Sequence, residues 1–184
     1  MKILNKKYFY GWMAAIIMSL SVATGCDDPY ANQVDYGKLE KEEADLRLAF
    51  FDLVKDSLLE LSTDSVDKLD EEGWVSFEIE KGSSDSVMAG KRVAFKYTYY
   101  YVFRDDEGVP VLSPKNTNIG TGTLATYTVG SMGQQDSEVL PGVDLAIRHM
   151  CLYGKSYILM THSLAFNDYY PVVAEIEVVA MDLD

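Results

Sequence analysis

The sequence predicts an α+β fold, in which an antiparallel sheet of about five strands wraps on one short helix and a longer N-terminal helix precedes it. Three segments carry this prediction. From Arg92 to Phe103 aromatic residues recur at every second position, which places them on one face of a strand. From Val143 to Met150 the apolar residues fall at i, i+3, i+4 and i+7, which marks one face of a short helix. Lys38 to Leu61 shows a longer helical pattern of the same kind.

The N-terminus has the pattern of a secretory signal. Residues 2–7 carry three lysines, and Tyr8 to Val22 is an uncharged apolar stretch of about 15 residues, short of the roughly 20 that span a bilayer. Three small residues, 23–25, then lead to Cys26. This order predicts a lipoprotein signal peptide over residues 1–25 and a lipid anchor on Cys26. The alternatives are an ordinary secreted protein with an incidental cysteine, or a short transmembrane helix.

Charge restricts the class of partner. Removal of residues 1–25, which hold three lysines and no acids, leaves 159 residues and changes the formal charge from −13 to −16. Such an acidic protein repels phosphate backbones, so nucleic acid is not an expected partner. It also lacks a polybasic contact with anionic lipid, which leaves the lipid anchor to hold the membrane. We therefore expect an envelope protein of the outer membrane. The acidic residues after Cys26 are also compatible with the inner membrane, and the sequence does not decide which membrane face displays the protein.

Cysteine and histidine usage predicts neither a metal nor a cofactor. Besides Cys26 the chain holds one cysteine, Cys151, so acylation of Cys26 excludes an internal disulfide, and a cysteine-based zinc site lacks ligands. The two histidines, His149 and His162, have no cysteine or carboxylate at ligand spacing, which favours structural or surface roles. The sequence leaves the oligomeric state open.

The segment before the main domain divides into a tether, a helix and a linker. Residues 26–37 are expected to be the tether, and 38–73 a helical extension with an acidic, turn-rich linker from Asp64 to Gly73. The carboxylates near the start of the helix, Glu43 among them, are typical of a solvated face. The apolar stripe expected to face the protein comprises Leu46, Phe50, Leu53, Val54 and Leu61, broadened by Leu48, Phe51 and Leu58.

Residues 74–184 form the predicted main domain. Its polar stretches are interpreted as turns and loops, with the longest from Ser113 to Gly122. The five expected strands are Trp74–Glu80, Arg92–Phe103, Thr123–Val129, Lys155–Met160 and Val172–Met181, with the short helix Val143–Met150 between the third and fourth.

The C-terminal third contains a series of short motifs in a fixed order. They are Val139-Leu140-Pro141-Gly142, the helix ending at Met150, Gly154-Lys155, Ile158-Leu159-Met160, Leu164-Ala165-Phe166 and the strand Val172–Val179, with Val93–Thr98 upstream. This order resembles FKBP-type peptidyl-prolyl cis-trans isomerases, whose second half shows V-I-P-G-W, a helix, G-x-K, an apolar strand, L-A-Y-G and a final strand. The resemblance covers about residues 74–182 and implies an FKBP-like fold, with proline-containing protein segments as partners.

The resemblance also implies a substrate pocket, with several replacements. Tyr97 stands at the family's strand tyrosine, and Val139 and Leu140 at its aliphatic pair. Phe166 stands where the family has a tyrosine whose hydroxyl binds substrate, and Val143 replaces the tryptophan that floors the pocket. Val111 is placed at a family phenylalanine by aligning Gly108–Ser113 with the G-x-x-F-D-S run, and Ala174 replaces a phenylalanine of the last strand.

Three functions remain open from the sequence. The first is a membrane-anchored isomerase that acts on extracytoplasmic proteins, with catalysis weakened by the replaced pocket residues. The second is a non-catalytic chaperone or binding module of an envelope complex on the same fold. The third is a carbohydrate- or protein-binding surface lipoprotein outside this family. No nucleophile, metal or cofactor is required by the first.

Overall fold

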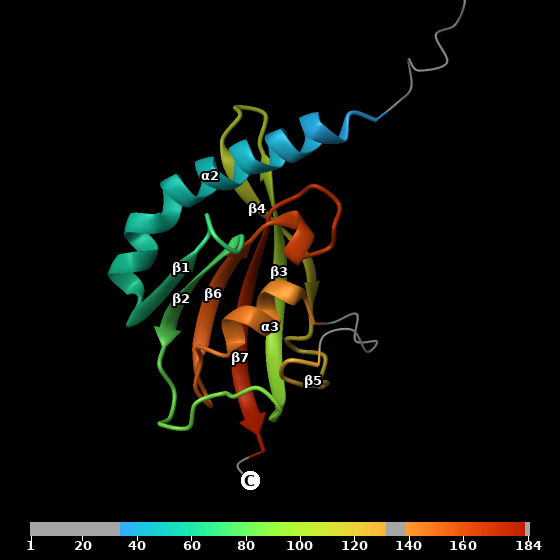
Figure 1. Cartoon of the computed structure of the whole chain (residues 1–184). Coiled ribbons are helices and arrows are strands. Elements are labelled where there is room, and N and C mark those ends of the chain that lie inside the picture. Colours follow the sequence, from blue (N-terminus) through green and yellow to red (C-terminus); the bar gives the residue numbers. More distant parts are fainter. Residues whose placement is uncertain (1–33, 132–138, 183–184) are drawn as a thin grey trace, which may run out of the picture. The chain divides into compact units, whose positions relative to one another are not determined.

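The computed structural model describes residues 34–131 and 139–182. Figure 1 shows a curved sheet with a short helix, α3, against it and a long helix, α2, lying across it. The elements are α2 (Tyr36–Leu61), β1 (Asp64–Lys68), β2 (Trp74–Glu80), β3 (Arg92–Arg104), β4 (Pro110–Thr117), β5 (Ala125–Thr128), α3 (Pro141–Ile147), β6 (Lys155–Met160), the 3-10 helix η1 (His162–Leu164) and β7 (Val172–Met181).

The sheet is antiparallel and has seven strands in the order β1-β2-β6-β7-β3-β4, with β5 beside β3. All five predicted strands are present, and the α+β prediction is confirmed. The two further strands, β1 and β4, lie at the sheet edges, where most of their residues are exposed. Edge strands are often polar and charged, so they carry no hydrophobic alternation. For this reason β4 occupies part of the predicted loop, and β1 part of the predicted linker.

The main core lies between the sheet and α3. Val143, Ala146 and Ile147 of the helix are fully buried, and they pack against the inward face of β3, β6 and β7. The helix begins at Pro141, a residue suited to the first turn because its missing N–H would have no partner there. The predicted helix 143–150 is therefore shifted toward the N-terminus, and its last residues form hydrogen-bonded turns.

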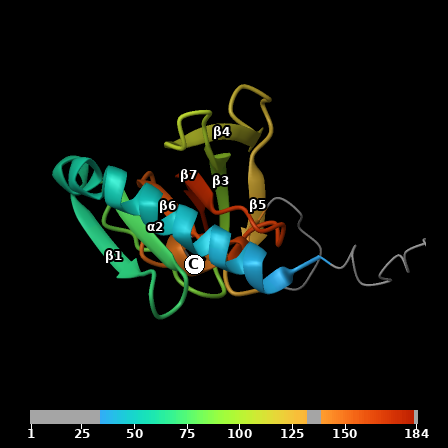
Figure 2. The same ribbon diagram turned by 90° about the horizontal axis from the view of Figure 1, so that it is seen from above.

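A second core lies on the other face of the sheet, beneath α2. Figure 2 shows the course of α2 across the sheet. The two clusters use alternate residues of the same strands, so the two helices cover opposite faces. The contact stripe follows Leu46, Phe50, Val54 and Leu58, four residues apart. The prediction of Leu53 as a core residue was wrong, because it is turned about 100° from Val54 and is 56% exposed. Leu48 and Leu61 are also exposed.

Glu43 departs from the expectation of a solvated acidic face. Its side chain is only 4% exposed and forms an ion pair with Arg47, 3.4 Å apart. Its carboxylate also accepts a hydrogen bond from the backbone N–H of His162 at 3.3 Å. This contact joins α2 to the loop after β6, within the compact unit Tyr36–Asp184.

Candidate functional site

Aromatic side chains form a continuous row along β3, which we call the aromatic ladder. Alternate residues of the strand point toward the α3 face, so Tyr97, Tyr99 and Tyr101 share that face. Phe166, from the segment after η1, packs edge-on against Tyr99 and Tyr101 with ring centroids 5.9 and 5.6 Å apart. The row comprises Phe95, Tyr97, Tyr99, Phe166, Tyr101, Phe103 and Tyr170.

The inner end of the ladder contains four of the pocket residues expected from sequence. Tyr97 is 2% exposed, and Val139, Leu140 and Val143 are 5%, 4% and 0% exposed. All four belong to the core around α3, and Phe166 packs against that core while keeping part of its surface exposed. The structure therefore brings these five residues into one apolar cluster. A peptide that approaches from solvent meets Phe166 before it meets the other four.

Val111 lies apart from this cluster. It pairs with Phe103 near the far end of the β3–β4 hairpin and is 39% exposed. Phe103 and Tyr97 are six residues apart on one strand, which corresponds to about 20 Å. The alignment of Gly108–Ser113 with the family run places Val111 too near the turn, because the hairpin is long and the residues that reach Tyr97 lie at the C-terminal end of β4 and just beyond it.

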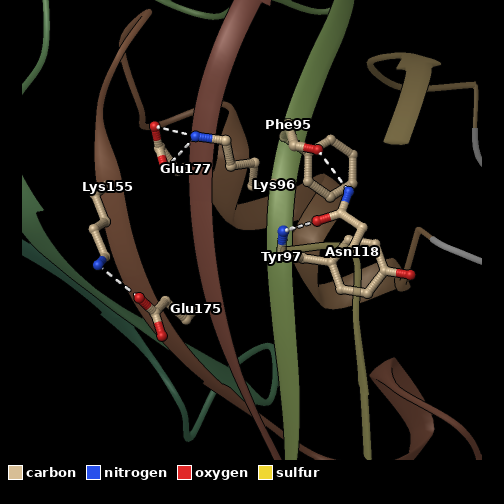
Figure 3. A network of polar contacts seen from close by, with 7 residues as sticks. All are labelled: Phe95, Lys96, Tyr97, Asn118, Lys155, Glu175 and Glu177. Atoms are coloured by element: carbon tan, nitrogen blue, oxygen red, sulfur yellow. Dashed lines mark hydrogen bonds and ion pairs between the residues drawn. The ribbon is translucent and has the colours of Figure 1, made fainter. Parts of the chain in front are cut away.

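Those residues are two asparagines that sequence reasoning missed. The side-chain amide of Asn116 donates a hydrogen bond to the Tyr97 hydroxyl at 3.2 Å. Asn118 is 8% exposed and accepts the backbone N–H of Tyr97 at 2.8 Å (Figure 3). Its side-chain N–H donates to the carbonyl of Phe95 at 3.1 Å. Both residues lie in a polar stretch that resembles any loop, so no sequence pattern marks them.

A tight loop positions Phe166. The backbone N–H of Asn167 donates to the carbonyl of His162 at 2.8 Å, and Asn167 and Tyr169 adopt positive φ angles of 58° and 65°. Such angles are uncommon for residues other than glycine. Next to Phe166, Asp168 accepts a hydrogen bond from the hydroxyl of Tyr101. Burial, and then this hydrogen bond, raise the pKa of Tyr101 above its ordinary value, so the phenol is neutral at physiological pH.

Two hollows lie near these residues. One, of about 620 Å³, lies between the N-terminal half of α2 and the loop after Phe166, and adjoins the ladder through Asp168 and Tyr170. Its other lining residues are Leu39, Glu42, Glu43, Asp45, Leu46, Arg104 and Tyr169. The second, of about 390 Å³, lies between α2 and the opposite sheet face and is mostly apolar, with Phe50, Phe77 and Leu159 in its walls.

The remaining polar candidates have structural positions. His149 packs against Trp74 with ring centroids 5.6 Å apart, and His162 stacks on Tyr169 at 4.5 Å. Cys151 is a free thiol of intermediate exposure. No group of three histidine, cysteine or acidic residues able to hold a metal ion occurs within residues 34–131 and 139–182. The signal segment and Cys26 lie outside the residues that the structure describes.

The outer face of the sheet beyond α2 carries charge pairs. Lys96 and Glu177 lie 3.1 Å apart, and Lys155 and Glu175 lie 2.6 Å apart (Figure 3). Partly exposed pairs of this kind contribute little to stability. They keep this part of the face solvated.

Comparison with known proteins identifies the fold. No family model and no sequence of a curated protein matches the chain. Among solved structures, the chain is similar to the N-terminal domain of FKBP42 from Arabidopsis thaliana, with 12% identity, a TM-score of 0.50 and coverage of 66% of this chain and 94% of that one. The fold expected from the FKBP resemblance is thereby confirmed: the chain has an FKBP-like fold.

Two bacterial structures are also similar at lower TM-scores. FkpA from Escherichia coli shares 13% identity over 97% of this chain and 74% of that one, with a TM-score of 0.47. A peptidyl-prolyl cis-trans isomerase from Pseudomonas syringae pv. tomato shares 18% identity over 82% of this chain and 98% of that one, with a TM-score of 0.48.

Proposed function

We propose that this chain is an FKBP-like peptidyl-prolyl cis-trans isomerase of low activity that acts on proline-containing segments of extracytoplasmic proteins. The observation that carries the proposal is the position of Phe166, whose partly exposed ring lies edge-on to Tyr99 and Tyr101 in the middle of the ladder. An exposed aromatic surface beside a buried apolar core suits the compact, apolar ring of proline. The fold supports the same reaction class.

The reaction requires surface and shape more than reactive groups. Rotation about a peptide bond is opposed by roughly 18–20 kcal/mol of partial double-bond character, and X–Pro exchange takes tens to hundreds of seconds without a catalyst. A dry aromatic site lowers this barrier when it binds the twisted amide better than the planar one. The ladder offers aromatic edges, and the exposed amide of Asn116, which donates to the Tyr97 hydroxyl, is a polar group beside its inner end.

Low activity follows from two features of the site. Phe166 has no hydroxyl to donate to a substrate carbonyl, and one such hydrogen bond is worth about 0.5–1.5 kcal/mol. Tyr97 and Val143 are almost wholly covered by neighbouring side chains, so they offer little surface to a peptide. We expect acceleration that is measurable at micromolar protein and well below diffusion control.

The test is isomerisation of an X–Pro peptide by the full chain, purified in a mild non-ionic detergent and followed by exchange NMR. Acceleration is expected for the native chain, and its loss for Phe166→Ala. Phe51→Ala, which removes a phenylalanine from α2 on the opposite sheet face, serves as the matched control and should retain activity. If the native chain does not accelerate exchange, the catalytic proposal is wrong.

A second candidate is a non-catalytic module that binds proline-containing segments. It is favoured by the burial of Tyr97, Val139, Leu140 and Val143, none of which is more than 5% exposed. The same peptides distinguish the two functions. Binding that depends on Phe166 without any acceleration of exchange would establish the module, whereas binding with acceleration would establish the enzyme.

The proposed location is the cell envelope, in the outer membrane, with the lipid on Cys26 as anchor. This part of the proposal is supported by the N-terminal signal pattern and by the acidic composition. Within the described ranges, no helix is long and apolar enough to span a bilayer. Labelling of growing cells with a clickable palmitate tests the anchor: the native chain should incorporate label and Cys26→Ala should not. Fractionation of the two membranes then tests the location.

A further inference from the structure

Lys115 is the extra residue of a β-bulge beside the ladder. In the pairing of β3 with β4, Tyr99 lies opposite Asn116 and Tyr100 lies opposite Pro114, so Lys115 has no residue opposite it on β3. A bulge of this kind re-aims a side chain and is frequent next to functional sites. Here it directs an exposed lysine from an edge strand onto the aromatic face.

The ammonium group of Lys115 lies over two rings of the aromatic ladder. Its Nζ is 4.8 Å from the ring centroid of Tyr101 and 5.7 Å from that of Phe166. Both distances are within the range of cation–π attraction, which holds the side chain in this place. A peptide that stacks on Phe166 therefore meets a positive charge at the same position.

That charge has no acidic partner in the part of the chain that is described: no carboxylate there lies within 4.0 Å of Nζ. Asp168 is already engaged by the hydroxyl of Tyr101, from which it accepts a hydrogen bond. The whole chain has a formal charge of −13, so an unpaired cation at the mouth of the site is a local exception. Opposite charges at such a position select partners more than they add affinity.

We infer that Lys115 is a specificity residue, which makes the site favour proline-containing segments with a glutamate or aspartate beside the proline. The inference rests on the proposed function and names the substrate class for it. The acidic side chain would meet the ammonium while the proline ring contacts Phe166. Two effects oppose each other: the Lys115 ammonium attracts the acidic side chain at short range, whereas the net negative charge of the chain repels an acidic peptide at long range.

The experiment separates these effects with matched peptides and matched variants of the full chain in detergent. The peptides are fluorescently labelled Ala-Glu-Pro-Phe and Ala-Gln-Pro-Phe, which differ by one charge. The variants are Lys115→Met, Lys115→Arg and Lys81→Met. Lys81 is exposed and directly follows β2, outside the ladder, so its replacement by methionine changes the net charge by the same amount as Lys115→Met. Binding is measured by fluorescence anisotropy at low and high salt, with thermal unfolding to verify folding.

The expected result is a ratio of affinities for the Glu and Gln peptides that is about two- to fivefold higher in the native chain than in Lys115→Met. Lys81→Met should keep the native ratio, Lys115→Arg should keep the preference for Glu, and high salt should reduce it. An equal ratio in the native chain and Lys115→Met overturns the inference and leaves the proposed function intact. Absence of binding to both peptides in the native chain overturns the proposed function, and this inference with it.

Discussion

The side-chain carbonyl of Asn118 accepts a hydrogen bond from the backbone N–H of Tyr97 at 2.8 Å, at a point where β3 has no neighbouring strand on that edge. Along one edge of β3, β5 pairs as far as Phe95 and β4 pairs from Thr98 onward. Between them the chain leaves the sheet, and backbone groups of β3 would lose their partners. The side-chain amide of Asn118 bonds to the backbone in this gap, because its N–H also donates to the carbonyl of Phe95. The inner end of the ladder thus depends on one buried amide.

Replacement of Asn118 by alanine is expected to lower the free energy of unfolding by about 2–4 kcal/mol, since two buried backbone groups lose their partners. The measurement is urea unfolding of the full chain followed by circular dichroism. Asn116→Ala is the control: it removes an exposed amide from the same segment and should cost less than about 1 kcal/mol. Equal losses in the two variants would contradict the role assigned to Asn118.

The fold was largely predictable because its inner elements carry strong patterns. The ladder residues Phe95 to Phe103 alternate, and Val143, Ala146 and Ile147 repeat with the period of a helix. The strands β1 and β4 were missed for a physical reason: their side chains contact solvent, so hydrophobic periodicity is absent. Leu53 was misassigned because the pattern in α2 contains more apolar residues than the single face that meets the sheet.

The candidate site was less predictable than the fold. Tyr97, Val143 and Phe166 were found through the resemblance, and the structure brings them together. Lys115, Asn116 and Asn118 were not predicted. Their roles depend on a β-bulge and on a gap between two strands, and both features arise from the pairing of distant segments. No local pattern reports such pairing. The misplacement of Val111 has the same origin, since the length of the β3–β4 hairpin decides which residue of β4 lies opposite Tyr97.

Gly82 and Gly108 form a matched pair for a test of close packing. Both have positive φ angles, 76° and 82°, which alanine adopts only with strain. A Cβ on Gly82 would lie 2.3 Å from the carbonyl oxygen of Leu152 and 2.4 Å from the nitrogen of Gly154, whereas a Cβ on Gly108 would have no atom within 4 Å. Gly82→Ala should therefore reduce the free energy of unfolding by at least about 2 kcal/mol more than Gly108→Ala. Urea unfolding of both variants measures the difference, and similar values would show that the turn relaxes freely.

Tyr101 should make stability fall at alkaline pH. Burial and the hydrogen bond to Asp168 raise its folded pKa above the ordinary value of 10.0. The unfolded chain therefore loses this proton first, and the contribution is complete below pH 10 and is lost as pH rises toward the folded pKa. The destabilisation caused by Tyr101→Phe should be larger at pH 8 than at pH 11, by at most about 1.4 kcal/mol per pH unit. Urea unfolding at both values tests this, and a difference that is constant with pH would contradict it.

Phe166→Tyr should increase function, because it restores the donor that the resemblance assigns to this position. The ring is already held edge-on by Tyr99 and Tyr101 and is partly exposed, so we expect the tyrosine ring to occupy the same place. One hydrogen bond to a substrate carbonyl is worth about 0.5–1.5 kcal/mol, which corresponds to about two- to tenfold. If the hydroxyl contacts the peptide only when the amide is twisted, exchange NMR should show faster isomerisation with unchanged affinity. If the hydroxyl contacts both the planar and the twisted amide, fluorescence anisotropy should show tighter binding. Phe51→Tyr places a hydroxyl on the opposite face of the sheet and should change neither quantity. A Phe166→Tyr chain that remains folded and gains neither rate nor affinity would mean that the proline site does not lie at Phe166.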